Sequence, residues 1–137
     1  AAEWWEDGYA FRIRHASRPM VVEIQGIIQG VVDDLLRGQS PARIAAKFHT
    51  TLVEVILQVC CRIRDLTGLQ QVALSGGVFQ NIRLLTGAMT HLQANGFEVY
   101  THSQVPPNDG GLSLGQAAVA SALLAQDRGE EASTRCA

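Results

Sequence analysis

Two glycine-containing segments hold the residue types best suited to chemistry. Residues 75–77 read Ser-Gly-Gly and interrupt an apolar run, and residues 106–111 read Pro-Pro-Asn-Asp-Gly-Gly. Glycine lets a backbone come close to a ligand, and the free N–H groups at the start of a helix attract anions. Asp109 would repel a bound phosphate unless a divalent cation lay between them. The two segments therefore favour metal–nucleotide chemistry.

The residues alone leave a structural interpretation open. Glycine turns between a strand and a helix are common, and Asp109 could simply cap the last helix. Ser75 does not fit a nucleophile elbow, which needs Gly-x-Ser-x-Gly, and no histidine or aspartate partner can be placed beside it. We interpret Ser75 as shaping the backbone or binding phosphate. His102 lies near the predicted cleft, whereas His49 is expected to be a hydrogen-bonded residue within a helix.

The two segments follow the strands of a predicted βαβ unit. Apolar patterns predict strands at 71–74 and 97–102, joined by a helix at 79–94, and a helix of small residues at 112–126. A right-handed crossover makes the two strands parallel neighbours. Ligands bind beyond the carboxyl ends of such strands, where both glycine segments lie.

Two longer helices precede this unit. The first is predicted to begin at Pro19 and to end at Gly38, and the second runs from an N-cap at Ser40 to Thr67. Residues 1–18 are predicted to be irregular, with a short strand within 9–14. Residues 19–126 form the main domain, and 127–137 a polar, flexible tail. The fold class is α/β.

Composition narrows the class of protein. The chain has 137 residues, is 47% hydrophobic, and carries a net charge of −2 with no basic block, so no nucleic-acid surface is expected. The longest apolar stretches are predicted to be too short to cross a membrane, and no signal peptide is visible. Three cysteines, with Cys60 and Cys61 adjacent, fit a reducing cytoplasm. The chain begins without methionine, so we expect a fragment.

Three stretches resemble one enzyme family. "ARIAAKFHTTL" at 42–52, "VALSGGVFQN" at 72–81 and "GFEVYTHSQVPPNDGGLSLGQA" at 96–117 resemble the C-terminal end of the hydrogenase maturation carbamoyltransferases of the HypF type, over residues 9–125. The resemblance implies the second-lobe portion of an actin/Hsp70/sugar-kinase-like (Kae1-like) fold, with nucleotide bound between two lobes. It implies that Asp109 is a metal ligand and that nucleotide is bound by Ser75, Gly76, Gly77, Asn81, Gly110 and Gly111.

The resemblance also implies a reaction. ATP and carbamoyl phosphate give carbamoyl-adenylate in a neighbouring domain, and the Kae1-like domain transfers the carbamoyl group to the C-terminal cysteine of a HypE-type partner. A divalent zinc, iron or magnesium ion would take its remaining ligands from the missing lobe. The family places two histidines there, and none of His15, His49, His91 and His102 forms an HxxxH pair. We therefore expect one wall of a site, inactive by itself, and assign no catalytic residue.

Other functions stay open. The chain could be a non-catalytic interaction lobe whose apolar face pairs with another lobe or with a second copy in a homodimer. It could also belong to a related O-carbamoyltransferase or tRNA threonylcarbamoyltransferase. The latter usually carry Thr-Asp-Asn-Gly in the second segment, which counts against them here.

Overall fold

The structure is a computed structural model that describes residues 8–14 and 19–134. It divides into two units, which we describe separately. Unit 1 consists of Ala1–Leu74 and Asn81–Tyr100, and unit 2 consists of Ser75–Gln80 and Thr101–Ala137. The two predicted glycine segments therefore both belong to unit 2.

Unit 1 begins with a small hairpin. Strand β1 (Arg12–Arg14) pairs antiparallel with β2 (Val21–Glu23), so that Ile13 faces Val22. The first helix, α1 (Gln25–Leu36), begins after this strand, and the predicted start at Pro19 is wrong. The β-branched pair Val21 and Val22 favours extended backbone, and pairing with β1 gives that backbone its hydrogen bonds.

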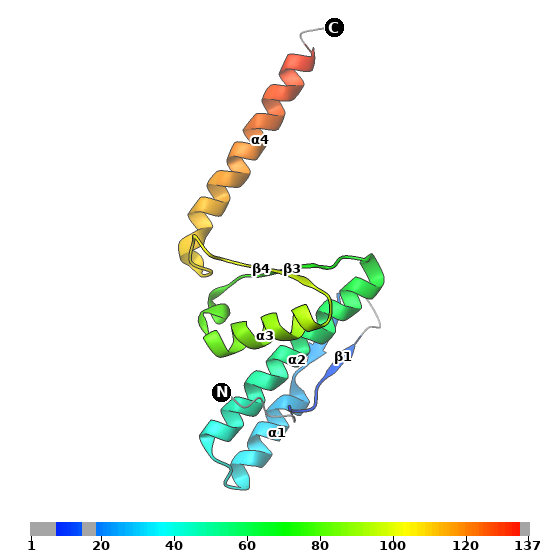
Figure 1. Ribbon diagram of the computed structural model, residues 1–137, viewed down its shortest axis with the longest axis vertical. Coiled ribbons are helices and arrows are strands. Elements are labelled where there is room, and N and C mark those ends of the chain that lie inside the picture. The colour runs from blue at the N-terminus through cyan, green and yellow to red at the C-terminus, as the bar shows by residue number, and fades with distance from the viewer. Residues whose placement is uncertain (1–7, 15–18, 135–137) are drawn as a thin grey trace. The chain divides into compact units, whose positions relative to one another are not determined.

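The long second helix has the predicted bounds. Helix α2 runs over Pro41–Thr67, and the Ser40 side chain caps it by accepting a hydrogen bond from the Arg43 N–H. It stops at Gly68, whose φ of 75° is left-handed and favours glycine. Helices α1 and α2 pack against each other in unit 1 (Figure 1).

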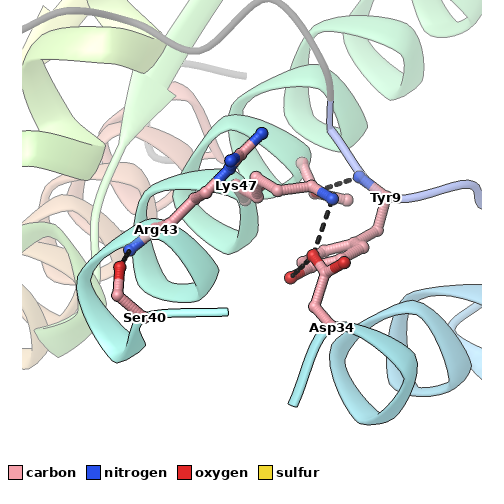
Figure 2. A network of polar contacts seen from close by, with 6 residues as sticks. Tyr9, Asp34, Ser40, Arg43 and Lys47 are labelled. Carbon is pink, nitrogen blue, oxygen red and sulfur yellow. Dashed lines mark hydrogen bonds and ion pairs between the residues drawn. The ribbon is translucent and has the colours of Figure 1, made fainter. Parts of the chain in front are cut away.

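A buried polar network ties the N-terminal segment to both helices (Figure 2). The Tyr9 N–H donates to Thr51 Oγ1 at 2.7 Å, and the Tyr9 hydroxyl donates to Asp34 Oδ2 at 3.0 Å. Lys47 Nζ lies 2.7 Å from the same Asp34 oxygen. The hydrogen bond from Lys47 lowers the pKa of Asp34, and burial, with help from Asp34, raises the pKa of Tyr9 to about 12. The network thus stabilises the ionised Asp34 and the neutral Tyr9.

The predicted βαβ unit is present. Strand β3 (Gln71–Leu74) lies next to β4 (Glu98–Thr101), and α3 (Ile82–Ala94) connects them. Figure 1 shows both strands running in one direction while α3 returns in the other. A short 3₁₀ turn, η1 (Gly77–Gln80), precedes α3, so this helix begins later than predicted.

Helix α3 packs on α2 through Leu84, Ala88 and Leu92, each almost fully buried. This spacing of four residues is the inner face of an α-helix. Ile82, in the first turn of the helix, lies outside this face and is 73% exposed.

Unit 2 ends in one long helix. A 3₁₀ turn, η2 (Asp109–Gly111), leads into α4 (Leu112–Thr134). The helix therefore continues beyond its predicted end at Gln126. Beyond Gln126 the sequence holds Glu, Arg and Ala, which are good helix formers, with a single Gly129 among them. The last residues, 135–137, lie outside the described part of the chain.

The expectation that every apolar stretch is too short to cross a membrane is wrong for helix α2. Among the described residues it is the one helix long and apolar enough to cross a membrane, with a mean hydropathy of 1.4 over its best 18 residues. This result rests on the length and composition of the helix alone. The core helix of a soluble protein meets the same criteria, and α2 packs against both α1 and α3 within unit 1. Only 17% of that 18-residue window is buried within this chain.

Candidate functional site

The Ser-Gly-Gly turn is fixed by one glycine conformation and one hydrogen bond. Gly76 has a φ of 107°, a value that L-amino acids with side chains rarely adopt. Its N–H donates to the Pro107 carbonyl oxygen at 2.8 Å, which joins the two glycine segments of unit 2. The turn then continues into η1, where the Phe79 N–H donates to the Gly76 oxygen.

The second segment is capped by Asn108. Its side-chain oxygen accepts from the Gly110 N–H at 3.0 Å, and its backbone oxygen accepts from the Gly111 N–H at 3.0 Å. Asn108 is thus the residue that caps η2. The alternative left by the sequence was that Asp109 caps the last helix. Within the described part of the chain, the structure gives the Asp109 carboxylate no hydrogen bond and no salt bridge.

The glycines of the two segments are needed for different reasons. A Cβ atom on Gly111 would lie 2.8 Å from the Pro106 oxygen, and one on Gly110 would lie 3.1 Å from Asn108 Oδ1. The packing of the loop requires glycine at 111, whereas at 110 a side chain would meet tight contacts that the neighbouring side chains could relieve. At Gly77 the nearest atom to such a Cβ would be 3.8 Å away, which is ordinary contact. The chain itself therefore does not require glycine at 77, and of the four glycines only Gly76 and Gly111 line the cavity of this unit.

A cavity of about 640 Å³ lies in unit 2 between the two segments and the start of α4. This volume suits a small-molecule ligand. Its polar wall comes from the two segments and includes Ser75, Gly76, His102, Asn108 and Asp109. Its apolar wall comes largely from α4 and includes Leu112, Val119 and Leu123. The cavity thus offers a polar end and an apolar end, as a nucleotide would need.

A contact in this cavity was missed by the sequence reasoning. His102 Nε2 lies 2.8 Å from Ser75 Oγ, although no histidine could be placed beside this serine from the sequence. The two residues follow β4 and β3, and neighbouring parallel strands bring their carboxyl ends together. The position of His102 directly after the second strand was the signal that could have revealed the pair.

Asn81 has structural partners in unit 1. Its Oδ1 accepts from the Leu84 N–H at 3.2 Å and so caps α3, and its Nδ2 lies 2.8 Å from His49 Nε2. His49 Nδ1 lies 2.7 Å from the Ala45 oxygen, so the ring donates there and accepts from Asn81. These contacts give both residues a role in the fold. A nucleotide contact of Asn81 stays a prediction.

Asp109 is a single candidate metal ligand. Among the described residues, no group of three or more histidine, cysteine, aspartate or glutamate side chains could hold a metal ion. Divalent cations take several oxygen or nitrogen ligands in proteins. A metal held at Asp109 would therefore need ligands from groups outside this set, such as a bound phosphate or another part of a longer protein.

Comparison with known proteins places this geometry in a family. Residues 1–116 match the family described as carbamoyltransferase, Kae1-like domain, second subdomain. Carbamoyltransferase HypF of Rhodobacter capsulatus is 40% identical over 90 residues, which are 66% of this chain and 12% of that protein. Carbamoyltransferase HypF of Synechocystis sp. is 31% identical over 111 residues, which are 81% of this chain and 14% of that protein.

A solved structure agrees with this match. The crystal structure of full-length HypF in the phosphate- and nucleotide-bound form superimposes with a TM-score of 0.84 at 40% identity, over 88% of this chain and 16% of that one. The chain therefore belongs to the Kae1-like carbamoyltransferase domains, and within them it is part of the Kae1-like domain of the HypF type. It spans only 12% and 14% of the length of the two curated relatives. The predicted Kae1-like α/β fold is confirmed.

Proposed function

We propose that this chain supplies one wall of the nucleotide and metal site of a HypF-type carbamoyltransferase that acts in the maturation of nickel–iron hydrogenase. The observation that carries the proposal is the cavity in unit 2, because both glycine segments line it. The fold of the chain also matches the crystal structure of a HypF in its phosphate- and nucleotide-bound form. The ligands would be ATP or carbamoyl-adenylate and a divalent zinc, iron or magnesium ion.

The two glycine segments would bind different parts of the ligand. The turn at Ser75, Gly76 and Gly77 would lie against phosphate oxygens, because N–H groups near the start of a helix favour anions. The loop of Gly110 and Gly111 would hold Asp109 at the cavity. A metal ion bound by Asp109 and by ligands from the rest of the protein would neutralise phosphate charge and polarise the carbamoyl oxygen.

The transfer itself would use groups outside this chain. The thiolate of the C-terminal cysteine of a HypE-type partner would attack the carbamoyl carbon of carbamoyl-adenylate. A carbon–sulfur bond forms, the carbon–oxygen bond to the phosphate breaks, and AMP leaves. This chain would position the leaving phosphate and would be inactive alone. The reaction would take place in the cytoplasm, where the thiolate is kept reduced.

Exposed apolar side chains support the proposal that a larger assembly contains this chain. On α4, leucine and valine side chains are more than half exposed, namely Leu112, Leu114, Val119, Leu123 and Leu124. Leu112, Val119 and Leu123 belong to the apolar wall of the cavity, whereas Leu114 and Leu124 lie outside its lining. We propose that the rest of a HypF-type chain covers Leu114 and Leu124, and a homodimer would be the alternative.

The test uses full-length HypF-type protein that contains this segment. Asp109→Ala should abolish transfer of the carbamoyl group to the HypE-type cysteine, measured by intact-protein mass spectrometry. Formation of carbamoyl-adenylate in the neighbouring domain should persist, because Asp109 lies outside that site. A matched control is Asp65→Ala, on the exposed end of α2, which should transfer normally. Normal transfer by Asp109→Ala would refute the proposed role of this cavity.

A further inference from the structure

His102 has no role so far in either the fold or the proposed chemistry, although it contacts Ser75, which the proposed function places against phosphate. Both side chains are exposed and line the cavity of unit 2, and His102 Nε2 lies 2.8 Å from Ser75 Oγ. Such a pair gains little stability at a surface, because water competes for both groups. The position of both side chains on the cavity wall, with Gly76 next to Ser75, suggests a role toward a ligand.

The direction of this hydrogen bond decides what Ser75 offers the cavity. If the serine hydroxyl donates to the ring, its oxygen lone pairs remain, and these would oppose an anion. If Nε2–H donates to the serine oxygen, the hydroxyl proton is free to donate to a ligand. A phosphate oxygen accepts hydrogen bonds and does not donate them when ionised. A bound phosphate therefore selects the arrangement in which His102 is the donor.

The side chains around the cavity agree with this arrangement. Asp109 is the acidic side chain among the lining residues, and His102 carries the imidazole nitrogen that reaches Ser75. The remaining lining residues are neutral. A donor at His102 and a donor at Ser75 thus form a short chain of hydrogen bonds that ends at the ligand, and chains of this kind strengthen each member.

We propose that His102 is a positioning residue, which donates from Nε2 to Ser75 and so presents the Ser75 hydroxyl as a donor to a phosphate group in the cavity. This inference rests on the proposed function, because it needs a phosphate-bearing ligand at this site. The ligand class is a phosphate monoester or nucleoside polyphosphate. Ser75 contacts the phosphate, and His102 acts through Ser75.

Binding and the position of the ring proton test the proposal together. Inorganic phosphate and, separately, ATP with Mg²⁺ are titrated into full-length HypF-type protein with this segment, and into its Ser75→Ala, His102→Ala and double variants. The carbamoyl-adenylate domain also uses ATP, so the affinity compared is that of the site that Asp109→Ala removes. Loss of one charge-assisted hydrogen bond should weaken binding roughly 10- to 100-fold. The double variant should bind no more weakly than the worse single variant, because the two residues act as a unit.

Two further variants separate positioning from folding. His102→Gln keeps an amide N–H donor at similar reach and should restore most of the affinity, whereas Ser103→Ala, beside the pair but outside the cavity lining, should bind normally. Long-range proton–nitrogen NMR of the full-length protein, with histidine selectively labelled with ¹⁵N, should show a proton on Nε2 of His102 at high phosphate. Thermal unfolding of every variant checks that the fold is intact.

The outcomes are distinct. If the unmodified protein binds phosphate or ATP but the losses are additive, or His102→Ala binds normally, the role of His102 is wrong and the proposed function stands. If phosphate binds while Nε2 carries no proton, the direction of the hydrogen bond is wrong. If the unmodified full-length protein binds neither ligand, the proposed function and this inference both fail.

Discussion

Replacing Gly111 with alanine should loosen the second glycine segment. The new Cβ atom would lie 2.8 Å from the Pro106 carbonyl oxygen, closer than real contacts allow. That oxygen belongs to the backbone and cannot rotate away, so the loop must shift. Overpacking of this kind costs about 1–3 kcal/mol. The Gly76 N–H, bonded to the adjacent Pro107 oxygen, should report the shift.

Amide hydrogen exchange measures this cost locally. If the cost appears as easier opening of the loop, the Gly76 amide should exchange roughly 5- to 150-fold faster, since about 1.4 kcal/mol is a factor of ten. The matched control is Gly115→Ala in α4, where the new Cβ atom meets nothing within 4 Å. That change should stabilise the helix by about 1 kcal/mol and leave Gly76 exchange no faster. Equal exchange in the two variants would refute the close-packing argument for Gly111.

Three further predictions concern unit 1. Leu92→Ala, at a fully buried position, should lower the free energy of unfolding by about 2–5 kcal/mol in urea denaturation. Ile82→Ala, at a 73% exposed position, should change this free energy by less than about 0.5 kcal/mol. Similar losses in the two variants would contradict the assigned inner face of α3. Asn81→Ala removes the cap of α3 and should lower the free energy of unfolding by about 1 kcal/mol, whereas Asn81→Asp keeps an acceptor and should retain most of that stability. Equal losses of stability in the two variants would show that the cap is unimportant. The pKa of Tyr9 is raised from about 10 to about 12, so its contribution to stability is complete below pH 10 and is lost as pH rises through 12. Thermal unfolding of Tyr9→Phe as a function of pH should lack this part of the alkaline loss of stability. A pH profile equal to that of the unmodified protein would contradict the prediction.

The sequence predicted the elements with strong local signals. Ser40 and Pro41 marked the start of α2, and Gly68 marked its end, because caps and left-handed glycine act within a single turn. The strand at 71–74 and the start of α4 at Leu112 were also predicted correctly. The errors came where tertiary pairing decided the outcome. Val21–Glu23 became a strand only because β1 lies beside it.

The candidate site was predicted in part. The two glycine segments lie together in unit 2, as their positions after neighbouring strands suggested. The sequence did not distinguish the glycines, because only packing distances show that Gly111 is required by its own loop and that Gly77 is not. The contact between Ser75 and His102 depends on the register of β3 against β4, which no local pattern encodes. The sequence likewise did not predict that side chains of α4 form the apolar wall of the cavity.

The most direct test of the central claim is a calorimetric titration of ATP with Mg²⁺. Full-length HypF-type protein with this segment, its Asp109→Ala variant and the Asp65→Ala control are titrated with and without the metal. Because the carbamoyl-adenylate domain also uses ATP, we predict two metal-dependent ATP sites in the unmodified protein and in the control, and only one such site in Asp109→Ala. Two such sites with unchanged affinity in Asp109→Ala would contradict the assignment of the metal and nucleotide site to this cavity.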